Sequence, residues 1–296
     1  MMIKEKKFIS IVFRVRNHEK YIEEFLNQII PLFEKNFENY ELICVNNEST
    51  DSTIDKLKAI CKSKFSHVTL NIISLAYCKS IEEAIAAGID FAIGDFVFEF
   101  DGIIINYDLE SLIKTYAIAL QGYDIVLFSP CRKSSISQKM YYALYNIGVI
   151  KSQKIYPVTV RVLSRRAINR LNNFAKLYSN DLSNILSCGM DVKREKYIPL
   201  SKQIKYDKTE KRERIYKAIE SFILYTNTIQ IIGLLFSGLS LICGVLFIGD
   251  LYACFLCLIL FVLFIISVVI TQYIRALINI NIKNEIHLIK NIEKGE

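Results

Sequence analysis

The sequence is poor in residues that break or cross-link a chain. Its 296 residues include no Trp, 4 Pro, 11 Gly and 3 His. So few Pro and Gly exclude a collagen-like chain and argue against a long linker, while a hydrophobic content of 52% excludes intrinsic disorder. The three His are too dispersed to suggest a metal site, and the sequence shows no Ser-His-Asp arrangement.

The eight cysteines lack the regular spacing of a disulfide framework. This distribution is typical of reduced thiols in the cytoplasm. The one Cys-x-x-Cys pair, Cys254 and Cys257, lies in a hydrophobic run and is interpreted as two small apolar residues rather than a metal or redox site. We expect no signal peptide, because residues 1–7 are charged and the apolar run after them is short.

Charged residues are nearly absent from one stretch, which explains the positive mean hydropathy of +0.28. Between Ile229 and Ile274 the only formal charge is Asp250, which separates the runs 229–249 and 252–274. Each run is long enough to span roughly 30 Å as a helix, the thickness of a bilayer core. The pattern predicts a C-terminal two-helix transmembrane hairpin at 229–275. A buried hairpin in a soluble core is the less favoured alternative.

Basic residues flank this hairpin only at its open end. Four precede the first run, Arg275 and Lys283 follow the second, and the connecting turn has none. The positive-inside rule therefore predicts a multi-pass protein of the cell (inner) membrane, with both termini and the main domain in the cytoplasm. We expect a basic juxtamembrane helix at 201–228 and a cytoplasmic tail at 276–296.

Acidic residues are absent from the middle of the chain. Residues 125–180 carry ten basic side chains and no acidic one. This favours a phosphate-rich partner, either anionic lipid head groups or a phosphorylated substrate; nucleic acid is disfavoured, since no binding module is recognisable. A solvated basic face is the alternative. Within this stretch, the Tyr-rich segment 136–150 is predicted to lie at the membrane interface, with an ordinary core helix as its alternative.

Apolar runs alternate with amphipathic segments before the hairpin. Strands are expected at 8–15, 40–45, 68–75, 96–100 and 123–128, with helices between them, and further strands at 157–163 and 196–200. This alternation predicts an α/β domain at 1–200 with a Rossmann-like, mainly parallel sheet covered on both faces. Such sheets bind ligands at the carboxyl ends of their strands.

Short motifs at these strand ends resemble a known family. They occupy residues 11–17, 45–53, 87–95 and 98–101. In order and spacing they resemble the family 2 glycosyltransferases of the GT-A fold. The hairpin, with Gln272-Tyr273-Ile274-Arg275 near its end, is similar to the polyprenyl-phosphate sugar transferase branch, which includes dolichol-phosphate mannosyltransferase and bactoprenol glucosyltransferase.

This resemblance implies an inverting transfer from a nucleotide-sugar to a polyprenyl phosphate, serving cell-surface glycan synthesis. The residues that it implies as donor contacts are Arg14, Asn17, Asn46, Asn47 and Ser49. Asp101 matches a catalytic carboxylate that holds Mg²⁺ or Mn²⁺. Arg132, Lys139 and Arg161 match positions that bind the acceptor phosphate, which needs positioning more than a strong base. A homo-oligomer stays open.

Several residues depart from the family pattern. Asn46 and Glu48 replace an Asp and a Gly, Ile103 replaces the second carboxylate of the Asp-x-Asp motif, and Thr159 replaces another Asp. The segment Cys78-Lys79-Ser80 replaces an Asn-x-Gly. The chain is thus either a divergent enzyme with a weak metal site or a catalytically degenerate scaffold that binds nucleotide or lipid.

Two aspartates keep alternative roles. Asp101 could cap a loop instead of binding a metal. Asp181 is the candidate base if the acceptor were a saccharide hydroxyl, but an N-cap of the helix that begins at Leu182 is the favoured role of Asp181.

Overall fold

The computed structural model describes most of the chain. The described residues are 4–77, 81–131, 136–147, 154–175, 182–187, 189–200, 212, 214–216, 218–219, 228–246, 251–282 and 288–295. They form two compact units. The first unit comprises residues 1–133, 156–208 and 286–296, and the second comprises 134–155 and 209–285.

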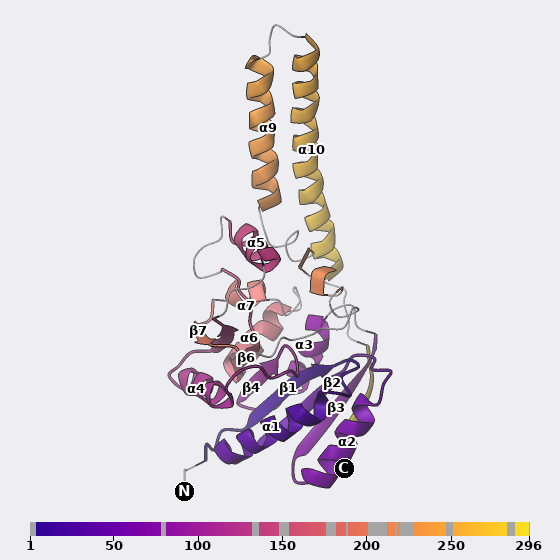
Figure 1. Cartoon of the computed structure of the whole chain (residues 1–296), viewed down its shortest axis with the longest axis vertical. Helices are drawn as coiled ribbons and strands as arrows, with labels where there is room; N and C mark the ends of the chain where they lie inside the picture. Colours follow the sequence, from indigo (N-terminus) through magenta and orange to yellow (C-terminus); the bar gives the residue numbers. More distant parts are fainter. Residues whose placement is uncertain are drawn as a thin grey trace. The chain divides into compact units, whose positions relative to one another are not determined.

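The first unit is an α/β domain (Figure 1). Its strands are β1 (Ile9–Val15), β2 (Tyr40–Asn46), β3 (Thr69–Tyr77), β4 (Phe96–Phe100), β5 (Ile125–Pro130), β6 (Val160–Ser164), β7 (Val192–Tyr197) and β8 (Leu288–Gly295). Its helices are α1 (Ile22–Asn36), α2 (Thr53–Lys64), α3 (Ile81–Phe91), α4 (Leu109–Ala119), α6 (Arg165–Ala175) and α7 (Leu182–Ser187). The predicted alternation of strands and helices is confirmed.

All eight strands belong to one mixed sheet, in the order β7-β5-β6-β4-β1-β2-β3-β8. Strands β4, β1, β2 and β3 are parallel neighbours, and β5 is parallel to β7. Only β6 and β8 run antiparallel to their neighbours. The carboxyl ends of β1–β5 and β7 therefore lie along one edge, which we call the carboxyl edge.

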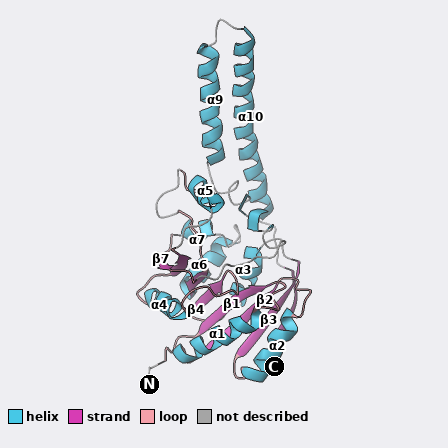
Figure 2. Ribbon diagram, viewed as in Figure 1, coloured by secondary structure: helices cyan, strands magenta, loops and turns pink. Residues whose placement is uncertain are grey.

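Alternating side chains of β1 face opposite sides of the sheet. Ile9, Ile11, Phe13 and Val15 join the main hydrophobic cluster, which also contains buried residues of α1, α2 and α4. Figure 2 shows α1 and α2 lying across one face of the sheet. The apolar residues of α1, which lies between the first two predicted strands, thus cover the sheet.

The opposite face contacts α3 through Gly88. A Cβ at this position would lie 2.6 Å from Val12 Cγ1 and 2.7 Å from Val45 Cγ2. Only a glycine allows the helix backbone to approach β1 and β2 this closely. The same face carries polar residues of the strands, among them Ser10, Glu41 and Glu99.

Two segments differ from the sequence prediction. The strand expected at 196–200 lies instead at Val192–Tyr197, where it pairs with β5; its charged, half-exposed sequence gave no apolar alternation to recognise. The segment 276–296, predicted as a tail, ends in β8, which pairs antiparallel with β3. An edge strand with one neighbour needs only backbone hydrogen bonds, so its sequence pattern is weak.

The second unit contains α5 (Ile136–Tyr145), α9 (Thr228–Leu246) and α10 (Leu251–Ile282). Helices α9 and α10 lie side by side (Figure 1). Phe236 stacks on Phe264 with ring centroids 5.4 Å apart, and Gly233 faces Val268. These pairs run in opposite sequence directions, so the two helices are antiparallel. Tyr252–Ile274 is long and apolar enough to cross a membrane, whereas the apolar stretch found in α9, Gly233–Cys243, is shorter.

Candidate functional site

The loops after β1 and β2 are joined at the carboxyl edge by the motif residues themselves. Asn17 Oδ1 accepts hydrogen bonds from Thr50 N at 2.8 Å and Thr50 Oγ1 at 3.3 Å. Ser49 Oγ accepts from Asn17 N at 3.3 Å, and Ser49 N donates to Asn46 Oδ1 at 3.0 Å. Three of the predicted donor contacts, Asn17, Asn46 and Ser49, are therefore brought together.

The backbone of these loops adopts the left-handed region at two non-glycine residues. Asn17 has a φ of 54° and Glu48 a φ of 55°. Such conformations cost free energy for an L-residue and persist where surrounding contacts fix them. Glu48, which stands where the resemblance implies a Gly, therefore holds a conformation that glycine would adopt without this cost.

The rest of the Ser-Thr-Asp-Ser-Thr motif holds the start of α2. Asp51 Oδ1 accepts from Thr53 N at 3.1 Å and from the Thr53 hydroxyl. Glu19 Oε2 accepts from Ser52 Oγ at 2.6 Å, and this hydrogen bond holds the pKa of Glu19 below its usual range. These polar residues stabilise the loop that carries Asn46 and Ser49.

Arg14 and Asn47 are the remaining predicted donor contacts, and both are buried. Arg14 lies near the end of β1 opposite Val45 of β2 and is 2% exposed. Asn47 follows β2, and its backbone N donates to Val15 O at 3.0 Å. Both are less exposed than Asn17 and Ser49, which follow the same two strands.

Asp101 directly follows β4 at the same edge and is partly exposed. Its backbone N donates to Thr159 O at 3.0 Å, which extends the β4–β6 ladder. Ile103, in the place of a second carboxylate, is 2% exposed and packs in the core. Among the described residues no three His, Cys, Asp or Glu side chains lie close enough to hold a metal ion.

This donor set suits a cation held by one carboxylate and by substrate oxygens. Mg²⁺ commonly keeps several waters and binds through one or two carboxylates together with phosphate oxygens. Asp101 can supply one such ligand, and Ile103 can supply none. A bound divalent ion would neutralise charge on a diphosphate leaving group.

Arg161 lies on β6 directly opposite Glu99 of β4. Arg161 Nη2 is 3.3 Å from Glu99 Oε1, with the two side chains 13% and 1% exposed. The sequence did not identify Glu99, although a carboxylate within the apolar strand Phe96–Phe100 is an unusual feature that signals a buried partner. Arg161 was expected to bind an acceptor phosphate, and the structure gives it a carboxylate partner within the sheet.

Thr159 and Tyr197 form a second polar contact beside Asp101. Thr159 Oγ1 lies 2.7 Å from Tyr197 Oη, which donates to Asn106 Oδ1 at 3.4 Å. The Tyr197 ring stacks on Phe128 with centroids 4.3 Å apart. Thr159 therefore has a structural partner in this chain.

Two more arginines of the basic stretch are engaged by the fold. Arg165 Nε and Nη2 donate to the carbonyls of Gly94 and Ala92, just after α3. Arg166 Nε donates to Asp124 Oδ1 at 2.7 Å, and Arg166 Nη2 also contacts Asp124. Burial alone would raise the pKa of Asp124, but the hydrogen bonds from Arg166 and Ser164 outweigh it and lower that pKa.

The remaining predicted site residues lie elsewhere. Lys139 is an exposed residue of α5 in the second unit. Arg132 and Asp181 lie outside the described residues, as does the segment 78–80.

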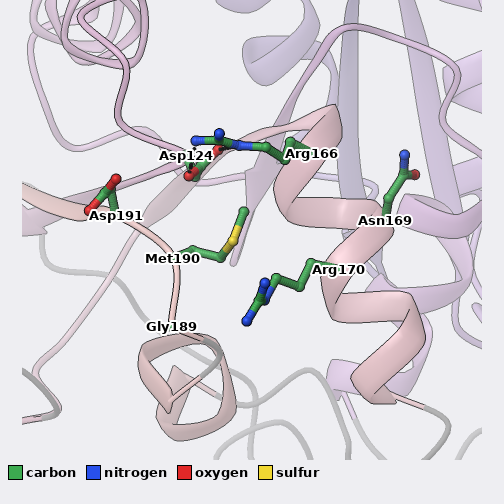
Figure 3. Close-up of a pocket in the computed structure, with 7 residues that line it drawn as sticks. All are labelled: Asp124, Arg166, Asn169, Arg170, Gly189, Met190 and Asp191. Carbon is green, nitrogen blue, oxygen red and sulfur yellow. Dashed lines mark hydrogen bonds and ion pairs between the residues drawn. The ribbon is translucent and has the colours of Figure 1, made fainter.

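A pocket of about 490 Å³ lies away from the carboxyl edge (Figure 3). Its lining includes Asp124 and Asp191, which immediately precede β5 and β7, together with Arg166, Arg170 and Met190. These positions mark the amino ends of the parallel strands. The pocket is therefore separate from the edge at which sheets of this kind bind ligands.

Comparison with known proteins finds similarity in the first part of the chain. Residues 10–143 match the family Glycosyl transferase family 2. An uncharacterized glycosyltransferase of Synechocystis is 28% identical over 55% of this chain and 52% of its own length. The undecaprenyl-phosphate 4-deoxy-4-formamido-L-arabinose transferase of Proteus mirabilis is 30% identical over 40% of this chain and 35% of its own length. The chain thus spans about a third to a half of the length of these two relatives.

A solved structure agrees in fold. The mannosyltransferase PcManGT from Pyrobaculum calidifontis, in complex with GDP-Man and Mn²⁺, superposes with a TM-score of 0.53 at 14% identity. The superposition covers 74% of this chain and 64% of that one. The first unit thus has the GT-A-like fold that the strand-end motifs predicted, and residues 10–143 are similar to the family 2 glycosyltransferases.

Proposed function

We propose that this protein is a membrane-anchored glycosyltransferase that transfers a sugar from a nucleotide-sugar to a polyprenyl phosphate at the cytoplasmic leaflet. The product would be a lipid-linked sugar for cell-surface glycan synthesis. The observation that carries the proposal is the combination, in one chain, of a family 2 domain with a helical hairpin that exposes its apolar side chains. Relatives named as undecaprenyl-phosphate sugar transferases support the lipid-phosphate acceptor.

In the hairpin, apolar side chains are exposed and polar ones are buried, as expected of a membrane protein. None of the most apolar window of Tyr252–Ile274 is buried, and Leu235, Leu239 and Ile242 of α9 are more than half exposed. By contrast, Gln230, Ser237 and Ser240 are buried. A water-soluble hairpin would reverse this arrangement, whereas lipid favours apolar side chains outside and small or polar ones between helices.

The C-terminal strand supports an even number of membrane crossings. Strand β8 hydrogen-bonds to β3 in the same sheet as β1 and β2. The chain on both sides of the hairpin must therefore lie on one side of any membrane that the hairpin enters. Together with the basic residues at the open end, this supports a hairpin with the α/β unit in the cytoplasm.

In the proposed reaction an acceptor phosphate oxygen attacks the anomeric carbon of the sugar. The bond from that carbon to the donor diphosphate breaks, the nucleoside diphosphate leaves, and the configuration inverts. The donor nucleotide would lie on the loops after β1 and β2. Its contacts there would be Asn17, Asn46 and Ser49, together with the more buried Arg14 and Asn47. Asp101 would hold a divalent cation on the diphosphate, so that Mg²⁺ or Mn²⁺ stabilises the leaving group.

The acceptor phosphate is already anionic, so positioning cations matter more than a base. We assign this role to Arg132 and Lys139. Because Arg161 contacts the buried Glu99, we move Arg161 from acceptor binding to the support of the donor side. Asp181 is needed as a base only if the acceptor is a saccharide hydroxyl.

A transfer assay tests the proposal. The full chain in detergent would be incubated with Mn²⁺, a short-chain polyprenyl phosphate and radiolabelled UDP- and GDP-sugars, with an Asp101→Asn variant as the negative control. We expect label in the lipid fraction for at least one donor. Transfer only to added glycan would contradict the lipid-phosphate acceptor.

A second candidate function is favoured by Ile103 and Asn46. Both replace family carboxylates, and Ile103 is packed into the core, where it binds no metal. A catalytically degenerate domain would bind nucleotide or lipid and act as a membrane scaffold. Nucleotide binding without turnover for every donor tried would support this function over transfer.

A further inference from the structure

A buried carboxylate lies within the central sheet without a role in the proposed reaction. Glu99 is 1% exposed, and the other residues of β4 are apolar. Removal of a carboxylate from water is costly unless an opposite charge and hydrogen bonds compensate it. Arg161, directly opposite on β6, supplies that charge at 3.3 Å.

Glu99 and Asp101 project from the same face of the sheet. Side chains along a strand alternate between faces, so residues two apart share one face and lie about 7 Å apart along the strand. Arg161 opposes Glu99, and Thr159 opposes Asp101. Arg161 is thus the diagonal neighbour of Asp101, a separation within reach of a long side chain.

Arg14 adds a second guanidinium to this face. In the β1–β4 register Val12 pairs with Glu99, so Arg14, two residues further, lies level with Asp101. Arg14 and Arg161 contribute two positive charges, and Glu99 and Asp101 contribute two negative ones. These four side chains therefore bring two charges of each sign to one face of the sheet, and among them Asp101 is expected to contact a cation.

We propose that Glu99 is a positioning residue of the transfer site, which holds Arg161 in β6 and offsets its charge so that Asp101 can bind a divalent cation. This inference rests on the proposed function only in its choice of Asp101 as the cation ligand. Removal of the Glu99 charge would add one unit of positive charge to the surroundings of Asp101. That charge would repel a cation and draw the Asp101 carboxylate toward the guanidinium.

Manganese binding tests this role without any transfer reaction. The full chain in detergent would be titrated with Mn²⁺ in the presence of UDP or GDP, and free Mn²⁺ would be followed by electron paramagnetic resonance. Glu99→Gln should raise the Mn²⁺ concentration for half-saturation about tenfold, since it removes the carboxylate that faces Arg161 and makes the surroundings of Asp101 more positive by one unit. The double variant Glu99→Gln with Arg161→Met, which removes both charges, should return this concentration to within about threefold of the original.

Glu41→Gln is the matched control. Glu41 is also buried on an internal strand, and its Oε1 accepts from Ser10 Oγ at 2.6 Å. It lies toward the amino end of β2, away from Asp101. Glu41→Gln should lower the thermal unfolding temperature as Glu99→Gln does, but it should leave Mn²⁺ binding unchanged.

The outcomes separate this inference from the proposed function. Unchanged Mn²⁺ binding in Glu99→Gln, no recovery in the double variant, or no Mn²⁺ binding by the unmodified chain would each overturn the role of Glu99. A tenfold shift with recovery would support it even if the chain made no lipid-linked sugar. In that case the proposed transfer function would be contradicted, and the positioning role of Glu99 beside Asp101 would be supported.

Discussion

Two regions of the molecule, the loops after β1 and β2 and the basic stretch 125–180, use their polar side chains in different ways. In the loops, Asn17, Asn46, Ser49 and Thr50 bond one another across two neighbouring strand ends. In the basic stretch, Arg161, Arg165 and Arg166 bond groups that belong to β4, to the segment after α3 and to the start of β5.

The difference shows what a run of like charge means in a folded chain. Residues 125–180 contain no acid, yet Glu99 and Asp124 supply carboxylates to two of its arginines and backbone carbonyls engage a third. Charge counted along the sequence thus overstates the positive charge left for a ligand. Within the described residues of this stretch, Lys139, Lys154, Arg166 and Arg170 are exposed, and Arg166 is so while it contacts Asp124.

The largest effect is expected at the carboxyl edge. Asp101→Asn should lower the transfer rate by about a hundredfold or more, because it removes the proposed cation ligand. The initial rate of lipid-linked sugar formation measures the effect. Asp108→Asn is the control, since Asp108 caps α4 through Ser111 and Asn caps a helix equally well. Equal activity of Asp101→Asn and the original chain would remove Asp101 from the site.

In the basic stretch we expect losses of stability rather than of substrate binding. Arg165→Ala should lower the free energy of unfolding by about 2 kcal/mol, because carbonyls beyond α3 lose a charged donor. Calorimetry of the chain in detergent measures this change, with exposed Lys154→Ala as the control. A rise in the acceptor KM at unchanged stability would instead make Arg165 a ligand of the acceptor.

The pH dependence of stability should distinguish Asp124 from Asp191, which lines the same pocket. The pKa of Asp124 is lower in the folded chain than in the unfolded one, so its ionised form stabilises the fold. This contribution is present above the unfolded pKa of about 4 and is lost as pH falls through the lower folded value. Asp124→Asn should therefore lower the unfolding temperature by several degrees at pH 7, and the difference should shrink below about pH 4.

Asp191→Asn is the control for this measurement, because Asp191 is exposed and lines the same pocket. Its unfolding temperature should follow that of the original chain at every pH. A pH-independent loss in Asp124→Asn would mean that shape, and not charge, matters at this position.

The smallest effect is expected for Lys139. Lys139→Ala should raise the KM for the lipid phosphate about threefold, since a single exposed cation contributes little in water. The donor KM should not change, and Lys139→Arg should retain the original value. A larger effect on the donor than on the acceptor would contradict the assignment.

Much of the α/β unit could be predicted from sequence because its strands are buried on both faces. Continuous apolar runs such as 8–15 and 40–45 correspond closely to β1 and β2. The motifs after these strands were predicted to meet because parallel strands end at one edge. Strands β7 and β8 lie at the two ends of the sheet, where one neighbour suffices, and their sequences carry too little apolar alternation to predict them.

The sequence by itself determined the alternation of strands and helices, the motifs that resemble family 2 glycosyltransferases and the two long apolar runs. Each of these features depends on residues close together in sequence. Only the tertiary structure decided which charges meet. Glu99 and Arg161 are far apart in the chain and become partners through the β4–β6 register. Likewise, only strand pairing returned the C-terminal segment to β3. Which distant strands become neighbours depends on contacts between segments far apart in the chain, and a local pattern of charge or hydropathy does not specify them.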